Sequence, residues 1–160
     1  MPDTHLPPAL HDRLAAILGP RGLLTDAADI APHLADWRGL YQGAALAVAR
    51  PATTEEVAAI IRLCAETGTP VVPQGGNTSM VGGATPDETG RLLVLSLQRM
   101  NRLRALDAAD MTMTVDAGMV LKTAQTLAAD AGCLFPLSLG AEGTATIGGV
   151  LSTNAGGNTT

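Results

Sequence analysis

Aromatic and basic side chains are scarce in this chain of 160 residues. Trp37, Tyr41 and Phe135 are its only aromatic residues, and Lys122 is its only lysine. The net charge is −5, and the ten lysine and arginine residues are scattered along the chain. Because a nucleic-acid surface needs a concentrated basic patch, we predict no nucleic-acid partner.

Cysteine and histidine are also few. Cys64 and Cys133 each stand among apolar neighbours, which predicts buried, reduced thiols rather than a zinc site. His5, His11 and His33 have no other metal ligands nearby in the sequence, so we predict surface histidines and no metal site. No apolar run has transmembrane length, and the N-terminus lacks the basic and apolar pattern of a signal peptide, which predicts a cytoplasmic protein without a transmembrane segment.

The common nucleotide and hydrolase signatures are missing. No Gly-x-Gly-x-x-Gly follows the first predicted strand, and Leu121 rather than glycine precedes Lys122, so a Rossmann site is disfavoured and a P-loop is excluded. No Gly-x-Ser-x-Gly elbow occurs. Glu142 is a lone acid in a polar loop, which predicts a solvated carboxylate.

Hydrophobic residues make up 46% of the chain and charged residues 16%, as in a globular protein with a real core. Leucines spaced as one face predict a first helix that Gly19 ends, and Thr25 or Asp26 caps a second through about Leu34. A capping box at Thr53 begins a third helix, with Val57, Ile60, Ile61 and Cys64 buried and Gly68 at its end. A fourth spans 120–130, before Gly132.

Apolar runs predict strands at 44–49, 71–72, 92–95 and 111–115, the last with core methionines. The first two strands and the helix between them predict a right-handed βαβ unit with a parallel pair. The fold class is therefore α+β. We predict an N-terminal helical segment and connector at 1–43, a first subdomain at 44–104, and the start of a second subdomain at 105–160.

Residues 73–83 hold the most informative stretch, Pro-Gln-Gly-Gly-Asn-Thr-Ser-Met-Val-Gly-Gly. This loop has no lysine, carboxylate or aromatic, and it follows the carboxyl end of a predicted parallel strand. Backbone N–H groups and small hydroxyls are suited to a phosphate or pyrophosphate. The residues alone indicate a large ligand with phosphates, not which nucleotide it is.

Two other stretches keep two interpretations each. Gly148 and Gly149 interrupt a predicted short helix at a cost of about 1 kcal/mol each relative to alanine, either because a ligand touches the backbone or because the helix packs closely. Residues 36–43 hold Trp37, Arg38 and Tyr41, either as a connector whose aromatics pack on the core or as a segment lining a ligand site. The chain ends just after Gly156 and Gly157, from which we predict a truncated protein.

The loop at 73–83 resembles the pyrophosphate loop of the FAD-linked oxidase superfamily, of the vanillyl-alcohol oxidase and p-cresol methylhydroxylase type. Residues 143–149 and 153–157 resemble the second FAD motif of that superfamily, and residues 36–39 and 50–57 also match. Together they are most similar to the D-2-hydroxyacid dehydrogenases, which include D-lactate dehydrogenase, the FAD subunit of glycolate oxidase and D-2-hydroxyglutarate dehydrogenase.

The resemblance implies that FAD lies between the two subdomains. Catalytic and metal-binding residues of the family belong to a later cap domain, so none is assigned here. The loop lacks the histidine that links FAD covalently in some members, which implies non-covalent FAD. The implied cofactor-binding residues are Pro73, Gln74, Gly75, Gly76, Asn77, Thr78, Ser79, Met80, Gly82, Pro136, Leu137, Gly143, Thr144, Thr146, Ile147, Gly148, Gly149, Asn154 and Gly157.

The implied activity is oxidation of a D-2-hydroxy acid to a 2-keto acid, with a hydride passing to the flavin. The partners would be this small substrate and an electron acceptor, and a homo-oligomer stays open. Alternatives are a non-redox flavoenzyme or a sugar or lactone oxidase of the same superfamily, or a flavin-binding fragment without turnover.

Overall fold

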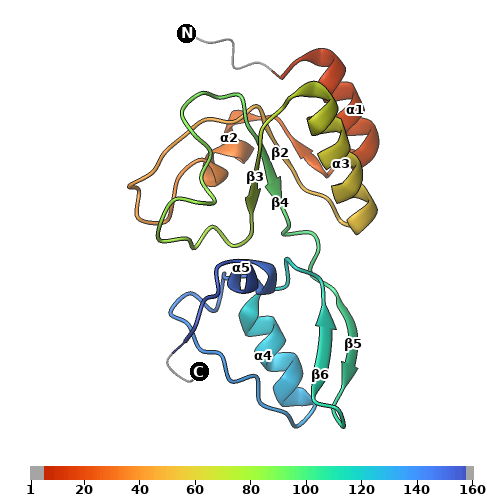
Figure 1. Ribbon diagram of the computed structural model, residues 1–160, viewed down its shortest axis with the longest axis vertical. Coiled ribbons are helices and arrows are strands. Elements are labelled where there is room, and N and C mark those ends of the chain that lie inside the picture. Colours follow the sequence, from red (N-terminus) through yellow and green to blue (C-terminus); the bar gives the residue numbers. More distant parts are fainter. Residues whose placement is uncertain (1–5, 158–160) are drawn as a thin grey trace.

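The computed structural model describes residues 6–157, which form two lobes (Figure 1). One lobe is built on a four-stranded sheet and the other on a two-stranded sheet. Helices accompany the strands in both lobes, so the predicted α+β fold class is confirmed. His5 and residues 158–160 lie outside the described residues, and so does part of the chain end from which truncation was predicted.

The first lobe begins with helix α1 (Pro8–Leu18), which buries its predicted leucine face and ends at Gly19 with φ 65°. A short strand that the sequence did not indicate, β1 (Leu23–Leu24), follows. The side chain of Asp26 then caps α2 (Ala27–Ile30) by accepting the N–H of Ala28. α2 continues directly into the 3-10 turn η1 (Ala31–His33).

The sheet of this lobe has the order β1-β2-β4-β3. β2 (Ala47–Ala49) and β3 (Val71–Gln74) are each parallel to β4 (Leu93–Ser96), and β1 is antiparallel to β2. The strands of the predicted parallel pair, β2 and β3, do run in the same direction. They are not neighbours, because β4 lies between them. β4 is buried along its whole length, and a central position satisfies both of its edges.

Helix α3 (Thr54–Thr67) joins β2 to β3 and begins as predicted. Thr53 Oγ1 accepts the N–H of Glu56 at 3.2 Å, and the Glu56 carboxylate accepts the N–H of Ala52 at 2.6 Å. Ile61 was wrongly predicted to be buried and is 44% exposed, since it lies about 100° around the helix from Ile60. Leu63 is buried instead.

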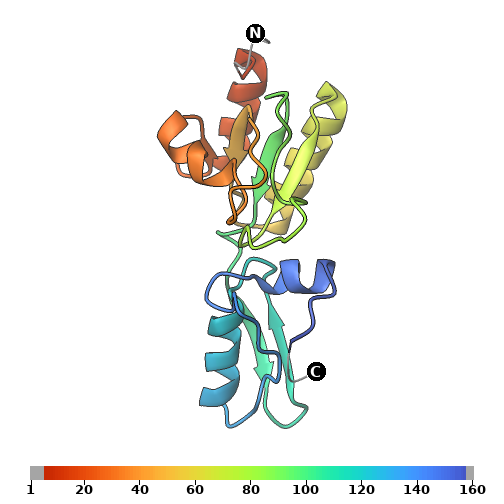
Figure 2. The same cartoon turned by 90° about the vertical axis from the view of Figure 1, so that its left-hand side faces the viewer.

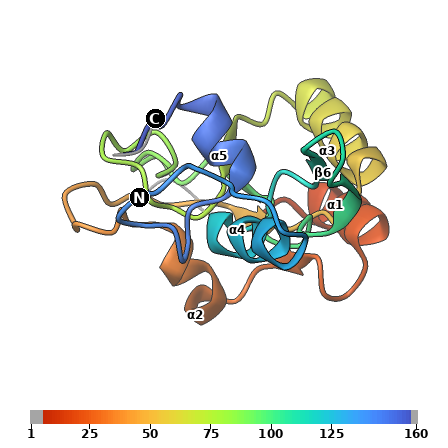
Figure 3. The same ribbon diagram turned by 90° about the horizontal axis from the view of Figure 1, so that it is seen from below.

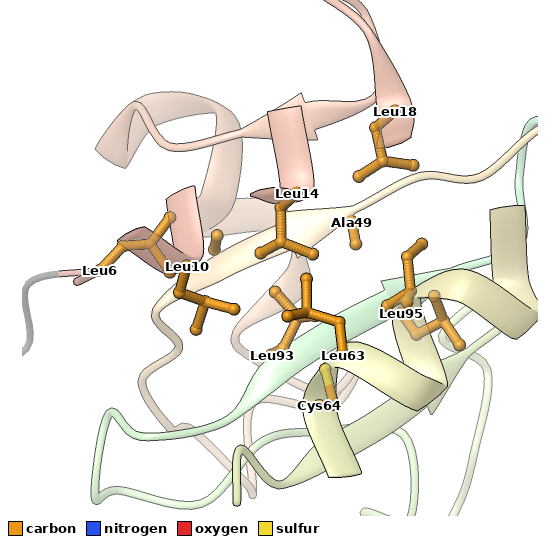
Figure 4. Packing of buried hydrophobic residues seen from close by; sticks show 11 residues of the cluster. Leu6, Leu10, Leu14, Leu18, Ala49, Leu63, Cys64, Leu93 and Leu95 are labelled. Carbon is orange, nitrogen blue, oxygen red and sulfur yellow. The ribbon is translucent and has the colours of Figure 1, made fainter. Parts of the chain in front are cut away.

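Two apolar layers cover the two faces of this sheet. Leucines of α1 and the inner face of α3 pack on alternate residues of β2 and β4, as Figure 4 shows. Ile30 of α2 packs on the opposite face, against Val48, Val72 and Val94. The carboxyl ends of β3 and β4 lie at the edge of this sheet that faces the second lobe (Figure 1).

The second lobe pairs β5 (Leu103–Asp107) with β6 (Thr112–Val115) in an antiparallel hairpin, beside α4 (Leu121–Asp130) and α5 (Ile147–Ser152) (Figure 2). Most of β5 is solvent-exposed, so it lacks the apolar alternation that would have predicted it. Met111 was wrongly assigned to the core: it is 82% exposed, with φ 50°, in the hairpin turn.

Candidate functional site

The glycine loop after β3 lies at the junction of the two lobes. Residues 75–79 are half-buried, and the loop lies beside α5 in the views of Figures 1 and 3. A Cβ atom on Gly75 would lie 2.3 Å from Thr146 Oγ1, and one on Gly76 only 1.9 Å from the Thr144 carbonyl oxygen. The backbone contact therefore requires glycine at position 76, and the fold brings the first predicted glycine cluster against the second.

The loop's backbone donors are unused. From Gly75 to Met80, no N–H group donates a hydrogen bond to any group of residues 6–157. β3 is an edge strand, so the chain that continues from it has no further strand to pair with on that side. A half-buried row of free N–H groups, without a nearby carboxylate in the loop itself, can accept an anion such as a diphosphate.

Asn77 and Gln74 use their side chains to hold the loop. Asn77 has φ 53°, and its Nδ2 donates to the Ala35 carbonyl at 2.7 Å, while its buried Oδ1 has no partner among the described residues. Gln74 is 2% exposed; its Nε2 donates to the carbonyls of His33 and Ala84 at 3.0 and 2.8 Å. The Gln74 amide is therefore fully engaged inside the protein.

His33 completes this arrangement and corrects a prediction. It was expected on the surface but is 7% exposed, with Nδ1 at 2.5 Å from Gln74 Oε1. Because Oε1 can only accept, Nδ1 is the donor. The sequence signal was weak, since a lone histidine at the end of a short helix gives no indication of a partner 41 residues away.

Residues 36–41 form a closed loop against the glycine loop. The buried Asp36 carboxylate accepts the N–H groups of Leu40 and Tyr41 at 2.7 and 2.8 Å. The hydrogen bond from Tyr41 lowers the pKa of Asp36, with burial opposing and the Leu40 bond assisting. Trp37 is 63% exposed and Tyr41 46% exposed, so the interpretation that these aromatics pack on the core was wrong.

This loop instead contacts the 80–82 part of the glycine loop. The Arg38 guanidinium donates to the Met80 carbonyl. A Cβ atom on Gly82 would lie only 2.9 Å from the nearest atoms of the Tyr41 ring. Gly82 also has φ 72°. Residues 36–41 thus contact residues 80–82 of the loop, whereas Thr144 and Thr146 contact residues 75–76.

The second predicted motif contains the start of α5. Thr146 caps this helix by accepting the Gly149 N–H, while the N–H groups of Ile147 and Gly148 donate to the carbonyls of Met119 and Ala117, both at 2.8 Å. A Cβ atom on Gly148 would lie 2.8 Å from that of Ala117. Helix packing therefore explains Gly148, whereas Gly149 meets only the movable Thr146 hydroxyl, at 3.2 Å.

The remaining predicted residues are more dispersed. Pro136 and Leu137 line a cleft of about 550 Å³ beside α4, whose lining includes none of residues 73–83. Gly157 packs against the Ser138 carbonyl. Pro73, Gly143, Thr144 and Asn154 are solvent-exposed, and Thr78 and Ser79 are half-buried. The structure brings residues 75–76 and 144–146 together, whereas Pro136 and Leu137 line a cleft whose lining includes none of these residues.

Glu142 is not the solvated acid that was predicted. It is half-buried and accepts from Gln125 Nε2 at 2.9 Å, with Lys122 Nζ at 3.5 Å. The Gln125 hydrogen bond lowers the pKa of Glu142, and burial partly opposes it. Of the two cysteines, Cys64 is buried as predicted and Cys133 is half-buried, and both are free thiols.

Ser96 is a candidate that the sequence analysis missed. It closes β4 opposite Gln74 in the parallel register, and its buried Oγ has no partner among residues 6–157. The sequence did contain a signal for Ser96, because it is a polar residue at the end of an otherwise apolar strand. Two orphaned polar oxygens, Ser96 Oγ and Asn77 Oδ1, therefore accompany the free N–H groups of the loop.

These features fit the diphosphate and adjoining hydroxyls of a dinucleotide such as FAD. Free N–H groups supply donors for the phosphate oxygens, and Asn77 Oδ1 can only accept, as a ligand hydroxyl would require. Within the described part of the chain, no three His, Cys, Asp or Glu side chains are grouped to hold a metal ion. No helix among those residues is long and apolar enough to span a bilayer.

Comparison with known proteins identifies the class. A family model described as "FAD binding domain" matches residues 45–160, so the chain belongs to this family of FAD-binding domains. The resemblance to FAD-linked oxidases is confirmed. The chain is 40% identical over 150 residues to the mitochondrial D-2-hydroxyglutarate dehydrogenase of Bos taurus, covering 91% of this chain and 27% of that one.

A bacterial relative and a solved structure agree. D-2-hydroxyglutarate dehydrogenase of Xanthomonas citri pv. viticola is 39% identical over 135 residues, which cover 84% of this chain and 28% of that protein. The chain thus spans about a quarter of the length of these curated relatives. A structure of alkyldihydroxyacetonephosphate synthase superposes with a TM-score of 0.84 at 23% identity, over 94% of this chain and 30% of that one, which shows a shared fold.

Proposed function

We propose that this chain is the FAD-binding portion of a flavin-dependent oxidoreductase that converts a D-2-hydroxy acid into a 2-keto acid. The observation that carries the proposal is the row of N–H groups at residues 75–80 that have no partner among residues 6–157, in a loop whose Gly75 and Gly76 lie directly against Thr146 and Thr144. The relatives named as D-2-hydroxyglutarate dehydrogenases support the choice of substrate class.

The chain's own residues would bind and orient the cofactor. The backbone of residues 75–80 would hold the diphosphate, and the Thr146 and α5 region would hold the flavin half. Bound FAD supplies the hydride acceptor. Gln74 and Gly148 would act indirectly, because the Gln74 side chain and the Gly148 N–H are already engaged within the protein.

Flavin reduction tests the proposal. The complete gene product that carries these residues is loaded with FAD, and the visible flavin band is followed anaerobically after adding D-2-hydroxyglutarate or D-lactate. We expect the D-enantiomers to bleach the band and the L-enantiomers to leave it unchanged.

The other outcomes separate the alternatives. Binding of FAD without bleaching by any 2-hydroxy acid would favour a non-catalytic flavin module or a non-redox member of the superfamily. Bleaching by aldoses or aldonolactones alone would favour a sugar or lactone oxidase. Failure to bind FAD at all would contradict the proposal at its base.

We further propose that FAD is held without a covalent bond. Residues 73–83 contain no histidine, and the nearby His33 is buried with Nδ1 bonded to Gln74. Acid precipitation of the holoprotein should therefore release all of the yellow colour into the supernatant. Colour that stays with the washed precipitate would contradict this.

The proposed function includes a cellular location and an electron acceptor. We propose a cytoplasmic protein that passes electrons from the flavin to a separate acceptor, with homo-oligomer formation open. The bovine relative is named as mitochondrial, which describes that protein. Fractionation of the source cells tests the location, and recovery in an organelle or membrane fraction would contradict it.

A further inference from the structure

We propose that residues 33–41 are a positioning element that fixes the shape of the glycine loop before a ligand arrives, with His33 as its central residue. The inference rests on the proposed function, because FAD is taken as the ligand of that loop. Neither the sequence motifs nor the resemblance gave residues 33–35 a part in ligand binding.

The first observation is a reciprocal pair between His33 and Gln74. The His33 ring donates to Gln74 Oε1, and Gln74 Nε2 donates back to the His33 main-chain carbonyl. Both side chains are buried, at 7% and 2% exposure. Gln74 is the last residue of β3, so the pair fixes the direction in which the chain enters the loop.

The second observation is that the same segment holds the loop at two later points. Asn77 Nδ2 bonds to the Ala35 carbonyl, which supports the left-handed φ of 53° at Asn77. Farther along, the Arg38 guanidinium bonds to the Met80 carbonyl. The attachments therefore bracket the stretch whose N–H groups are free.

The third observation is that few other contacts among the described residues hold residues 75–80 in place. From Gly75 to Met80 the backbone N–H groups have no partners in the described chain, and glycine restricts φ and ψ least. Without external support such a segment would sample many conformations, and a ligand would lose affinity by ordering it. Residues 33–41 and residues 144–146 supply that support.

The test compares four proteins as complete gene products: wild type, His33→Leu, His33→Asn and the control His11→Leu. Asparagine Nδ2 can occupy the place of the histidine Nδ1 donor, whereas leucine leaves the buried Gln74 Oε1 without a partner. We expect the FAD dissociation constant to rise about tenfold or more for His33→Leu, and to stay within about threefold of wild type for His33→Asn. His11→Leu, the same change on the surface of α1, should bind as wild type.

Affinity is measured by flavin fluorescence, and the apoprotein is melted in parallel. Equal FAD affinity in His33→Leu and wild type, or equal weakening in His33→Leu and His33→Asn, would overturn the inference. If His33→Leu does not fold, Arg38→Met, which removes the more exposed bond to the Met80 carbonyl, is tested in its place. An unchanged FAD affinity in Arg38→Met would also overturn the inference. A wild-type protein that binds no FAD would instead refute the proposed function.

Discussion

At the scale of single residues, the glycines of the loop differ in what they do. Gly76 approaches the Thr144 carbonyl so closely that a methyl group has no room, whereas Gly83 meets nothing nearer than Ser79 Oγ at 4.0 Å. Composition alone could not rank them, because both are members of glycine pairs in one loop. The difference between Gly76 and Gly83 depends on the Thr144 carbonyl, which lies about 70 positions away from Gly76 in the chain.

This difference makes a paired prediction. Gly76→Ala should lower the free energy of unfolding by about 1–3 kcal/mol, because the backbone carbonyl of Thr144 must move. Gly83→Ala should change it by less than about 1 kcal/mol and in the stabilising direction, since alanine restricts the unfolded chain. Denaturant titration of both variants checks this, and equal effects would contradict the assigned contact.

At the scale of elements, the sequence predicted helices better than strands. α3 was located at both ends because Thr53, Glu56 and Gly68 are local capping signals. β1 and β5 were missed because a two-residue strand and an exposed strand carry no periodic apolar pattern. The position of β4 between β2 and β3 was also missed, since strand order depends on which strand is most completely buried.

In the candidate site, too, features with a local sequence signal were predicted and features that depend on distant contacts were not. Residues 73–83 were identified from composition, because a run of small residues after a strand has few other uses. The attachments that shape this loop were not, because His33, Ala35 and Arg38 come from a segment without a motif for contacts across about 40 residues. Long-range hydrogen bonds between unlike segments leave no periodic signal in a single sequence.

At the scale of the whole molecule, an ion-pair cluster joins the lobes. Asp116, after β6, is fully buried and accepts hydrogen bonds from the side chains of Arg104 and Arg102 and from the Arg102 N–H. Arg102 also reaches the Ala52 carbonyl, at the start of α3 in the first lobe, at 3.5 Å. This cluster therefore connects residues 102–116 of the second lobe to residue 52 of the first.

The pKa of Asp116 gives this cluster a pH signature. Burial is the largest single influence and raises the pKa, but the bonds from Arg104 and Arg102 together outweigh it, so the pKa lies below the usual 3.8. A carboxylate whose pKa is lower in the folded state stabilises the fold above the unfolded value of about 3.8, and this contribution is lost as the pH falls through the folded pKa.

Asp116→Asn should therefore lower the free energy of unfolding by about 1–3 kcal/mol near pH 7, because neutral oxygen replaces a charged acceptor. Between about pH 5 and pH 2 the stability of wild type should fall more steeply than that of Asp116→Asn, so the two curves converge. Arg13→Gln, which breaks the exposed pair with Glu66, should change stability by less than about 1 kcal/mol and keep the wild-type pH dependence. Parallel curves for wild type and Asp116→Asn would show that the carboxylate does not couple the lobes to pH.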